Sequence, residues 1–519
     1  YSSLDQKNKF QVFEYDVLNN SNRQISPTGH GDIDNFDSCY LPNGDVIFAS
    51  TRCYHGVPCV GGGSDVANLC RMDSLGQNIR MLCFDQDDNW HPSLLNNGKI
   101  MYTRWEYTDT PHYFTRIVMS MNPDGTNQKA FYGSNSYWPN SLFYAQALPN
   151  SATKFIGIIS GHHGTRRSGE MVIFDVARGR HEAEGAVQKI PGFGKKVEPV
   201  IEDRLVDDVW PKFLTPYPIS DEYFLVSMQR SPYEHFGLYL VDIFDNIVPI
   251  LRDPNFGLLE PIPLRSRQTP PEIEDKVRAG ADSATVFMSD VSIGPGLDGV
   301  PKGTVKSLRL FEWHYAYRKT GGHNNVGIDG PWEPHRILGT VPVYKDGSAH
   351  FTVPANTPIA VQPLDKEGKA IQIMRSWFTA MPGERLSCVG CHESQNIIPP
   401  ARPTIAARTE PSPIKHWYGP PRGFSFKREV QPVLDKKCVG CHDGAKEGRP
   451  DFSRGKDIVG LRRNDDYKFT PAYVALMPYV RRTGPENDYH LQVPYEYHSD
   501  TSELVTLLQK GHHNVQLDA

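Results

Sequence analysis

The sequence predicts a mainly β protein with an N-terminal β-propeller, a β-rich middle domain and a small α-helical C-terminal domain. Its 519 residues include 44 glycines and 42 prolines, about a sixth of the chain against a typical ~12%, which favours many turns. Short apolar runs alternate with turn signals over the first half. Helical periodicity is confined to the last quarter of the chain.

Residues 1–265 are predicted to form the propeller, incomplete at its N-terminal end. Polar units recur every ~40–50 residues, which is typical of propeller blades. The units 37–52 and 90–104 each run from a polar start through a glycine turn into an apolar strand that ends in Thr-Arg. A pair of β-sandwiches is the alternative for the same pattern.

Residues 266–400 are predicted to form the middle domain, and residues 401–519 the C-terminal domain. A segment rich in proline and arginine, 261–274, marks the first boundary, and 397–421, with seven prolines, predicts a linker. In the last segment Phe426, Val430 and Leu434 share one helical face that leads to Cys438. A second helix is predicted with Asp500 as its N-cap, Glu503 at N3 and Gly511 just past its end.

Composition excludes several classes of function. The net charge is −5, so a nucleic-acid partner has no general electrostatic support. The mean hydropathy is −0.48, and no run approaches the ~18 apolar residues of a membrane span. Because the chain begins at Tyr1 without a signal peptide, we expect a mature or truncated form.

Two identical C-V-G-C-H motifs predict two covalently attached haem c groups. They run from Cys388 through Cys391 to His392, and from Cys438 through Cys441 to His442. The two thiols of such a motif add to the vinyl groups of one porphyrin, and the following imidazole can ligate the iron. A zinc site of two C-x-x-C pairs predicts ~15–20 intervening residues, whereas 46 residues lie between Cys391 and Cys438.

Histidines supply the candidate axial ligands. His442 is the expected proximal ligand of the second haem, with His512 or His513 on its far side and His490 and His498 as rivals. His392 is the default proximal ligand of the first haem. Its far side has four candidates or stays open for a substrate: His314, His323, His335 and His350.

Five further cysteines lie near the N-terminus: Cys39, Cys53, Cys59, Cys70 and Cys83. Haem c is attached outside the bacterial cytoplasm, where these thiols could form two disulfides with one thiol left over. A leftover thiolate beside a histidine could instead bind zinc.

These residues carry a resemblance to the alpha subunits of hydrazine synthase and their multihaem relatives. The resemblance implies a β-propeller, a middle domain with a catalytic haem c and a C-terminal bis-histidine cytochrome domain. The matching stretches are Tyr102–Tyr107, Met121–Gly125, Gly330–His335, Gly339–Val343, Arg375–Glu393 and, less specifically, Glu429–His442.

The resemblance also implies an activity, partners and a ligand set. Such a subunit joins ammonia and hydroxylamine to hydrazine at its first haem, and works with beta and gamma subunits. In that family a tyrosine four residues after the first motif's histidine ligates the iron, while the histidine helps to bind zinc. Carried over, His392 would bind zinc with a thiolate from Cys53, Cys59, Cys70 or Cys83, but the tyrosine position is Asn396 here.

The sequence therefore predicts a dihaem oxidoreductase subunit that takes a small nitrogen substrate and exchanges electrons with a redox partner protein. Its expected location is extracytoplasmic, in the periplasm or an equivalent compartment such as the anammoxosome. Two alternatives stay open: a dihaem electron-transfer subunit without substrate chemistry of its own, and a dihaem peroxidase-like enzyme.

Overall fold

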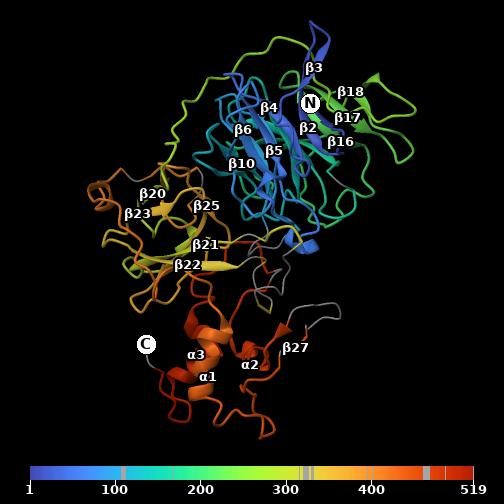
Figure 1. The fold of residues 1–519 in the computed structure, drawn as a ribbon. Helices are drawn as coiled ribbons and strands as arrows, with labels where there is room; N and C mark the ends of the chain where they lie inside the picture. Colours follow the sequence, from blue (N-terminus) through green and yellow to red (C-terminus); the bar gives the residue numbers. More distant parts are fainter. Residues whose placement is uncertain are drawn as a thin grey trace. The chain divides into compact units, whose positions relative to one another are not determined.

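A computed structural model describes residues 1–106, 113–165, 167–314, 316–319, 327–328, 332, 334–393, 396–399, 401–456, 458–459, 468–484 and 487–517. The chain divides into two compact units, which are described separately below (Figure 1). Unit 1 comprises 1–55, 65–281 and 379–384, and unit 2 comprises 56–64, 282–378 and 385–519. Within the described ranges, no helix is long and apolar enough to cross a membrane.

Unit 1 consists of five antiparallel sheets that follow one another along the chain. Each sheet is built from strands adjacent in sequence, as short apolar runs separated by tight turns require. The strands are β1 (Ser2–Leu4), β2 (Phe10–Asp16) and β3 (Ser21–Gln24); β4 (Asn35–Tyr40), β5 (Val46–Ser50), β6 (Asn68–Met72) and β7 (Arg80–Met81); β8 (Asn89–Leu94), β9 (Ile100–Trp105), β10 (Arg116–Met121) and β11 (Lys129–Tyr132); β12 (Leu142–Ala147), β13 (Lys154–Ile159), β14 (Glu170–Asp175) and β15 (Ala186–Ile190); and β16 (Lys212–Pro218), β17 (Tyr223–Gln229), β18 (Gly237–Asp242) and β19 (Ile247–Leu251).

Consecutive sheets of unit 1 pack face to face. The first strands of neighbouring sheets contact one another in chain order, from β4 to β8, β12 and β16. Apolar clusters fill the spaces between sheets, with Phe155 and Phe174 in one and Phe213 and Phe224 in the next. The mainly β prediction is confirmed. Serial sheets with contacting first strands suit a propeller, and its closure stays a prediction.

The first strand of four sheets carries the same irregularity. A β-bulge interrupts β4, β8, β12 and β16, and in each bulge one non-glycine residue has a positive φ. These residues are Asp37 (51°), His91 (50°), Tyr144 (51°) and Thr215 (45°). Because a positive φ strains any residue with a Cβ, its recurrence marks a position that the repeat maintains.

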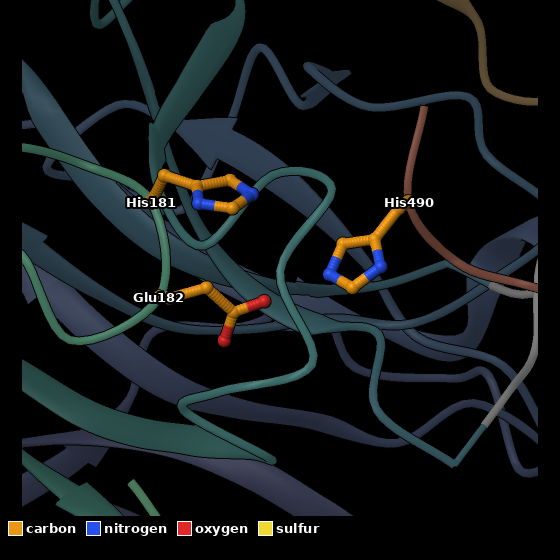
Figure 2. Close-up of side chains that lie close together, drawn as sticks. All are labelled: His181, Glu182 and His490. Atoms are coloured by element: carbon orange, nitrogen blue, oxygen red, sulfur yellow. The ribbon is translucent and has the colours of Figure 1, made fainter. Parts of the chain in front are cut away.

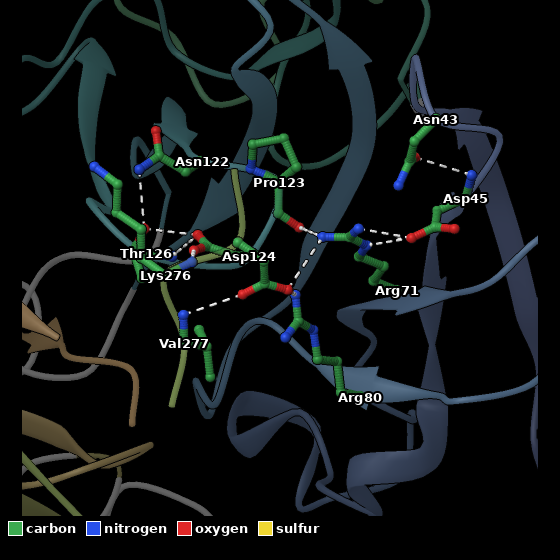
Figure 3. A network of polar contacts seen from close by, with 11 residues as sticks. Asn43, Asp45, Arg71, Arg80, Asn122, Pro123, Asp124, Thr126, Lys276 and Val277 are labelled. Atoms are coloured by element: carbon green, nitrogen blue, oxygen red, sulfur yellow. Dashed lines mark hydrogen bonds and ion pairs between the residues drawn. The ribbon is translucent and has the colours of Figure 1, made fainter. Parts of the chain in front are cut away.

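The chain that leaves the last sheet of unit 1 is fastened back to this unit (Figure 3). The backbone N–H of Lys276 donates to Asp124 Oδ2 at 2.8 Å. Arg80 pairs with Asp275, and Arg71 bridges Asp275 to Asp45, with nitrogen–oxygen distances of 3.6 and 2.6 Å. Residues beyond the predicted boundary segment 261–274 therefore still belong to unit 1.

Unit 2 contains two sheets that position the first motif. The order in one is β23-β20-β26, and in the other β22-β21-β24-β25. The strands are β20 (Ser283–Met288), β21 (Ser307–Trp313), β22 (His335–Pro342), β23 (Ala349–Pro354), β24 (Pro358–Leu364), β25 (Phe378–Thr379) and β26 (Arg385–Cys388). A short pair, β27 (Ile458–Val459) and β28 (Lys468–Phe469), lies in the C-terminal part.

Residues 405–415 of the predicted linker are attached to the sheets of unit 2 by backbone contacts. Ser412 and Lys415 form backbone bridges to the sheets at Phe351 and Thr340, and the Ile405 N–H donates to Asp346 at 2.7 Å. Prolines remove N–H donors but leave the intervening residues free to pair.

Three short helices form the C-terminal part: α1 (Gln431–Lys437), α2 (Pro471–Leu476) and α3 (Glu503–Gln509). The predicted helix before Cys438 is confirmed, with its first turn, Phe426–Val430, wound as a π-helix. The prediction of Asp500 as N-cap is wrong. Residues Ser499–Thr501 form a 3-10 turn, and α3 begins after Ser502.

Candidate functional sites

The first C-x-x-C-H motif begins at the end of strand β26. Strand β26 pairs in parallel with β20, and Cys388 stands opposite Met288. The backbone continues this pairing into the motif, because Ser289 N–H donates to Cys388 O and Asp290 N–H donates to Val389 O, each at 3.0 Å. The motif therefore starts from a fixed backbone rather than from a free loop.

Close backbone contacts hold the rest of this loop. A Cβ on Gly390 would lie 2.1 Å from Ile293 O, so glycine is needed where the loop meets segment 290–296. Glu393 turns back and accepts from Val389 N–H at 3.2 Å through one carboxylate oxygen. His392 has a φ of 56°, so the residue after the second cysteine is held in a left-handed turn.

Burial sets the chemistry of the two thiols. Desolvation, with a smaller contribution from Glu393, raises the pKa of both Cys388 and Cys391 to about 12. Both therefore stay protonated thiols at neutral pH.

The sheet register decides between the far-side candidates of the first motif. His350 pairs with Phe287, whereas Cys388 pairs with Met288, the next residue of β20. Because successive side chains point to opposite faces, His350 and Cys388 lie on opposite faces of this sheet. His350 instead bonds through Nδ1 to Thr409 O at 3.0 Å.

The other three histidine candidates lie in or next to the second sheet of unit 2, or outside the described residues. His335 packs on Trp313 with ring centroids 3.7 Å apart, and burial lowers its pKa to about 3. Burial and Arg336 lower the pKa of His314, so both are neutral imidazoles. His323 lies outside the described residues.

The second motif follows the end of α1. Cys438 N–H donates to Leu434 O at 2.8 Å, and both Cys441 and His442 N–H donate to Cys438 O, at 3.1 and 3.0 Å. These bonds coil the motif into one more turn that carries both thiols. Desolvation raises the pKa of Cys438, which packs against the apolar cluster around Leu434 and Phe452.

His442 is oriented by its surroundings. Its Nδ1 lies 3.0 Å from Pro450 O, and its ring stacks on Phe452 at 4.8 Å between centroids. The hydrogen bond to a carbonyl requires a proton on Nδ1, which leaves the Nε2 lone pair free. This is the arrangement expected of a metal-ligating histidine.

His512 faces His442 across a distance that suits two ligands of one metal. Their ring centroids lie 5.9 Å apart with planes at 31°. A metal–nitrogen bond of about 2.0 Å, plus about 1.1 Å from nitrogen to ring centre, places two trans imidazoles about 6.2 Å apart. Desolvation and the neighbouring His513 lower the pKa of His512, which favours the neutral, ligating form.

The rival histidines are engaged elsewhere. His498 Nε2 lies 3.4 Å from Asp365 and its Nδ1 3.8 Å from Asp500. His490 Nδ1 lies 3.3 Å from Asp488. His513 packs at right angles to His512 at 4.6 Å. Among the four predicted far-side ligands, His512 therefore has the geometry that fits.

The structure joins none of the five N-terminal cysteines by a disulfide. Burial raises the pKa of Cys39 and Cys53 to about 11 and of Cys70 to about 12, and raises that of Cys83 further. Cys59 and His392 fall in unit 2, and the other four thiols in unit 1. Zinc binding by His392 with one of these thiolates stays a prediction.

A histidine–glutamate pair that the sequence analysis did not select lies in the loop between β14 and β15. His181 and Glu182 are neighbours in this loop (Figure 2). Glu182 accepts from the backbone N–H of Tyr137 and Trp138, each at 2.9 Å, and so shapes segment 136–138. His490, also labelled in Figure 2, belongs to unit 2.

Mainly β units and two C-x-x-C-H motifs define the class as a β-rich protein with c-type haem signatures. A family model described as the hydrazine synthase alpha subunit middle domain matches residues 303–393. Hydrazine synthase subunit alpha of Kuenenia stuttgartiensis is 21% identical, in a match that covers 48% of this chain and 42% of that protein. The chain thus matches less than half of that relative's length.

The solved structure of Kuenenia stuttgartiensis hydrazine synthase shares the fold. It superposes with a TM-score of 0.70 and 16% identity, over 93% of this chain and 77% of that one. The resemblance predicted from the sequence is confirmed: the chain is similar to the hydrazine synthase alpha subunit in sequence and in fold.

Sequence reasoning located both motifs but missed the groups that hold them. Pro450 and Phe452 follow His442 by eight and ten residues, with no motif to mark them. Glu393, next to the first motif, could have been noticed from its position alone.

Proposed function

We propose that this chain is the haem c-bearing, alpha-like subunit of a hydrazine-forming enzyme. Ammonia and hydroxylamine would combine at the first motif, and electrons would pass through the second. The observation that carries the proposal is the family match at 303–393, because its end coincides with the first C-x-x-C-H motif. The reaction balances as NH₃ + NH₂OH giving N₂H₄ + H₂O, with an N–N bond formed and an N–O bond broken.

The residues of the second motif fit a covalently held haem. Two thiols stand on one turn, His442 directs Nε2 away from Pro450, and His512 faces it at a distance suited to a common metal. Two imidazoles would make the iron six-coordinate, and such a haem transfers electrons rather than binding substrate. This donor set supports an electron-transfer role for the C-terminal part.

The residues of the first motif fit a covalently held haem. The raised pKa of Cys388 and of Cys391 keeps both thiols protonated, and His350, the histidine nearest along the sheet, faces away from Cys388. When bound, a haem supplies an iron that can hold a small nitrogen ligand and exchange electrons. The chain's part is to anchor the group through a loop fixed by β20, Gly390 and Glu393.

We assign His392 as the proximal donor of the first motif because the family's tyrosine position is Asn396 here. An amide is a poor iron ligand beside an imidazole. If His392 bound zinc instead, the iron would have no histidine ligand on this side. X-ray absorption at the iron and zinc edges distinguishes the two, since His392→Ala removes one imidazole from the iron shell in the first case and from the zinc shell in the second.

The proposed setting is a complex in an extracytoplasmic compartment. Likeness to an alpha subunit implies other subunits, which we propose to be multihaem, beta- and gamma-like chains, with a redox partner protein serving the second haem. Covalent attachment of haem c requires that compartment. Size analysis of the native protein from its host, with haem staining of each chain, tests this setting.

The activity is tested with isotopes on the native protein and its co-purifying subunits. ¹⁵N-hydroxylamine and ¹⁴N-ammonia should give hydrazine with one label, because each nitrogen has a different source. Doubly labelled hydrazine would mean that hydroxylamine alone supplies both atoms. Absence of hydrazine, with both haems attached and reducible, would refute the proposed reaction and leave an electron-transfer subunit.

A further inference from the structure

The repeated bulges of unit 1 bring three polar side chains together from three consecutive sheets. Asp37, His91 and Tyr144 occupy equivalent bulge positions on β4, β8 and β12, with φ values of 50–51°. The ring centroids of His91 and Tyr144 lie 4.1 Å apart. The backbone N–H of His91 donates to Asp37 Oδ2 at 3.2 Å. The repeat thus places the first bulge residue of three neighbouring sheets close together.

His91 is a buried polar side chain without a hydrogen-bond partner. It is 8% exposed, and no described residue forms a hydrogen bond with Nδ1 or Nε2. Phe143 and Tyr144 cover the ring on two sides. Because the large majority of buried polar atoms have a partner, two unpartnered nitrogens on one imidazole indicate a group that binds there.

The position of Asp37 indicates where that group binds. His91 Nε2 and Asp37 Oδ2 lie 3.4 Å apart, yet their orientation gives no hydrogen bond. Two ligands at about 2.1 Å from one tetrahedral metal are about 3.4 Å apart. The two atoms thus have the spacing of neighbouring ligands that share a metal rather than of a donor and its acceptor.

The charged groups around the pair are Asp37, Glu260, Arg167 and the N-terminal ammonium. Burial and the nearby Arg167 hold the pKa of His91 well below its ordinary value, so the imidazole is neutral with a lone pair available. Asp37 and Glu260 interact electrostatically, and each carboxyl has its pKa raised by burial. With both carboxyls ionised, these four groups carry no net charge, so the ligand atoms, rather than the local charge, would select the ion.

We infer that Asp37 and His91 form a binding site for a first-row divalent metal ion in unit 1, with Zn²⁺ as the reference ion. An imidazole with a carboxylate selects such ions over Ca²⁺ and Mg²⁺, which prefer oxygen ligands alone. Asp37 keeps 22% of its side chain exposed, which provides a route of entry. Water molecules would complete the coordination, so we expect weaker binding than at a closed four-ligand site. This site is independent of the proposed hydrazine chemistry.

The first test measures zinc bound by the full-length protein in equilibrium dialysis. The wild type should bind one more equivalent of Zn²⁺ than His91→Gln or Asp37→Asn, each of which removes one ligand. The matched control is His163→Gln, because His163 pairs with Asp203 at 2.8 Å but is 52% exposed. It should bind as much as the wild type. Equal zinc in all four proteins would overturn the inference.

The second test does not depend on the folding of a variant. Crystals of the wild type soaked in Zn²⁺ should give an anomalous peak at the zinc edge within about 2.2 Å of both His91 Nε2 and Asp37 Oδ2. A bound water would also satisfy two polar atoms at this spacing. Density there without anomalous signal would therefore show water only and refute the metal site.

Discussion

The two C-V-G-C-H motifs are identical in sequence but differ in how tightly their glycine is packed. A Cβ on Gly390 would lie 2.1 Å from Ile293 O and 2.7 Å from Asp290 O, both backbone atoms. A Cβ on Gly440, at the same place in the second motif, would meet no protein atom within 4 Å. Gly390→Ala should therefore disrupt the first motif, whereas Gly440→Ala leaves the second intact.

The magnitude follows from the displacement required. Ordinary contact begins at 3.4 Å, so the loop must move away from Ile293 by about 1.3 Å. Overpacking costs about 1–3 kcal/mol, and more where backbone must shift. The shift would also weaken the bonds to Cys388 O and Val389 O, each worth about 1 kcal/mol. We expect Gly390→Ala to destabilise unit 2 by about 3–5 kcal/mol.

The assay combines thermal unfolding with haem counting. At ~2–4 °C per kcal/mol for a unit of this size, the unit 2 transition should fall by roughly 6–20 °C in Gly390→Ala. The haem content of Gly390→Ala, measured from the pyridine haemochrome spectrum, should fall towards one haem per chain. Gly440→Ala should change neither value measurably. If the two variants match in stability and haem content, the close packing of the first motif is not as the structure describes.

Three further predictions follow from individual side chains. His512→Ala should convert the second haem from low to high spin in the ferric EPR spectrum. The control His513→Asn should leave the spectrum unchanged, since asparagine tolerates the φ of 46° at position 513. An unchanged spectrum in His512→Ala would exclude His512 as a ligand. Burial lowers the pKa of His55 to about 4 and that of His335 to about 3. As the pH falls below 6.5, these histidines are protonated in the unfolded chain before they are protonated in the folded one, so each should reduce the free energy of unfolding by about 2 kcal/mol at pH 5. Equal free energies of unfolding from urea titrations at pH 7.5 and pH 5 would contradict this. Arg375 donates to the carbonyls of residues 488–490, so Arg375→Ala should speed proteolysis near that segment. Limited digestion followed by mass spectrometry would detect the faster cleavage, and Arg375→Lys should restore only part of the protection. If Arg375→Ala is digested at the wild-type rate, Arg375 does not hold this segment.

Local patterns predicted the parts of the fold that depend on adjacent residues. Alternating strands with glycine turns gave the serial sheets of unit 1, and the spacing of Phe426, Val430 and Leu434 gave the helix before Cys438. The two motifs were identifiable because covalent haem attachment needs thiols and imidazole at fixed spacing.

The remainder depends on contacts between distant segments. The face on which His350 lies follows from its register with β20, and no local pattern contains that register. The N-cap of α3 is Ser502 rather than the predicted Asp500, because the preceding residues form a separate 3-10 turn. Likewise, the pairing of Asp37 with His91 joins positions 54 residues apart, which only the packing of neighbouring sheets brings together.

The measurement that tests the central proposal most directly is EPR of the ferric native protein with and without hydroxylamine. The proposal predicts one low-spin signal from a bis-histidine haem and one high-spin signal from the first motif, of which only the high-spin signal changes when hydroxylamine is added. Two low-spin signals that hydroxylamine leaves unchanged would contradict a reactive first haem and make the chain an electron carrier.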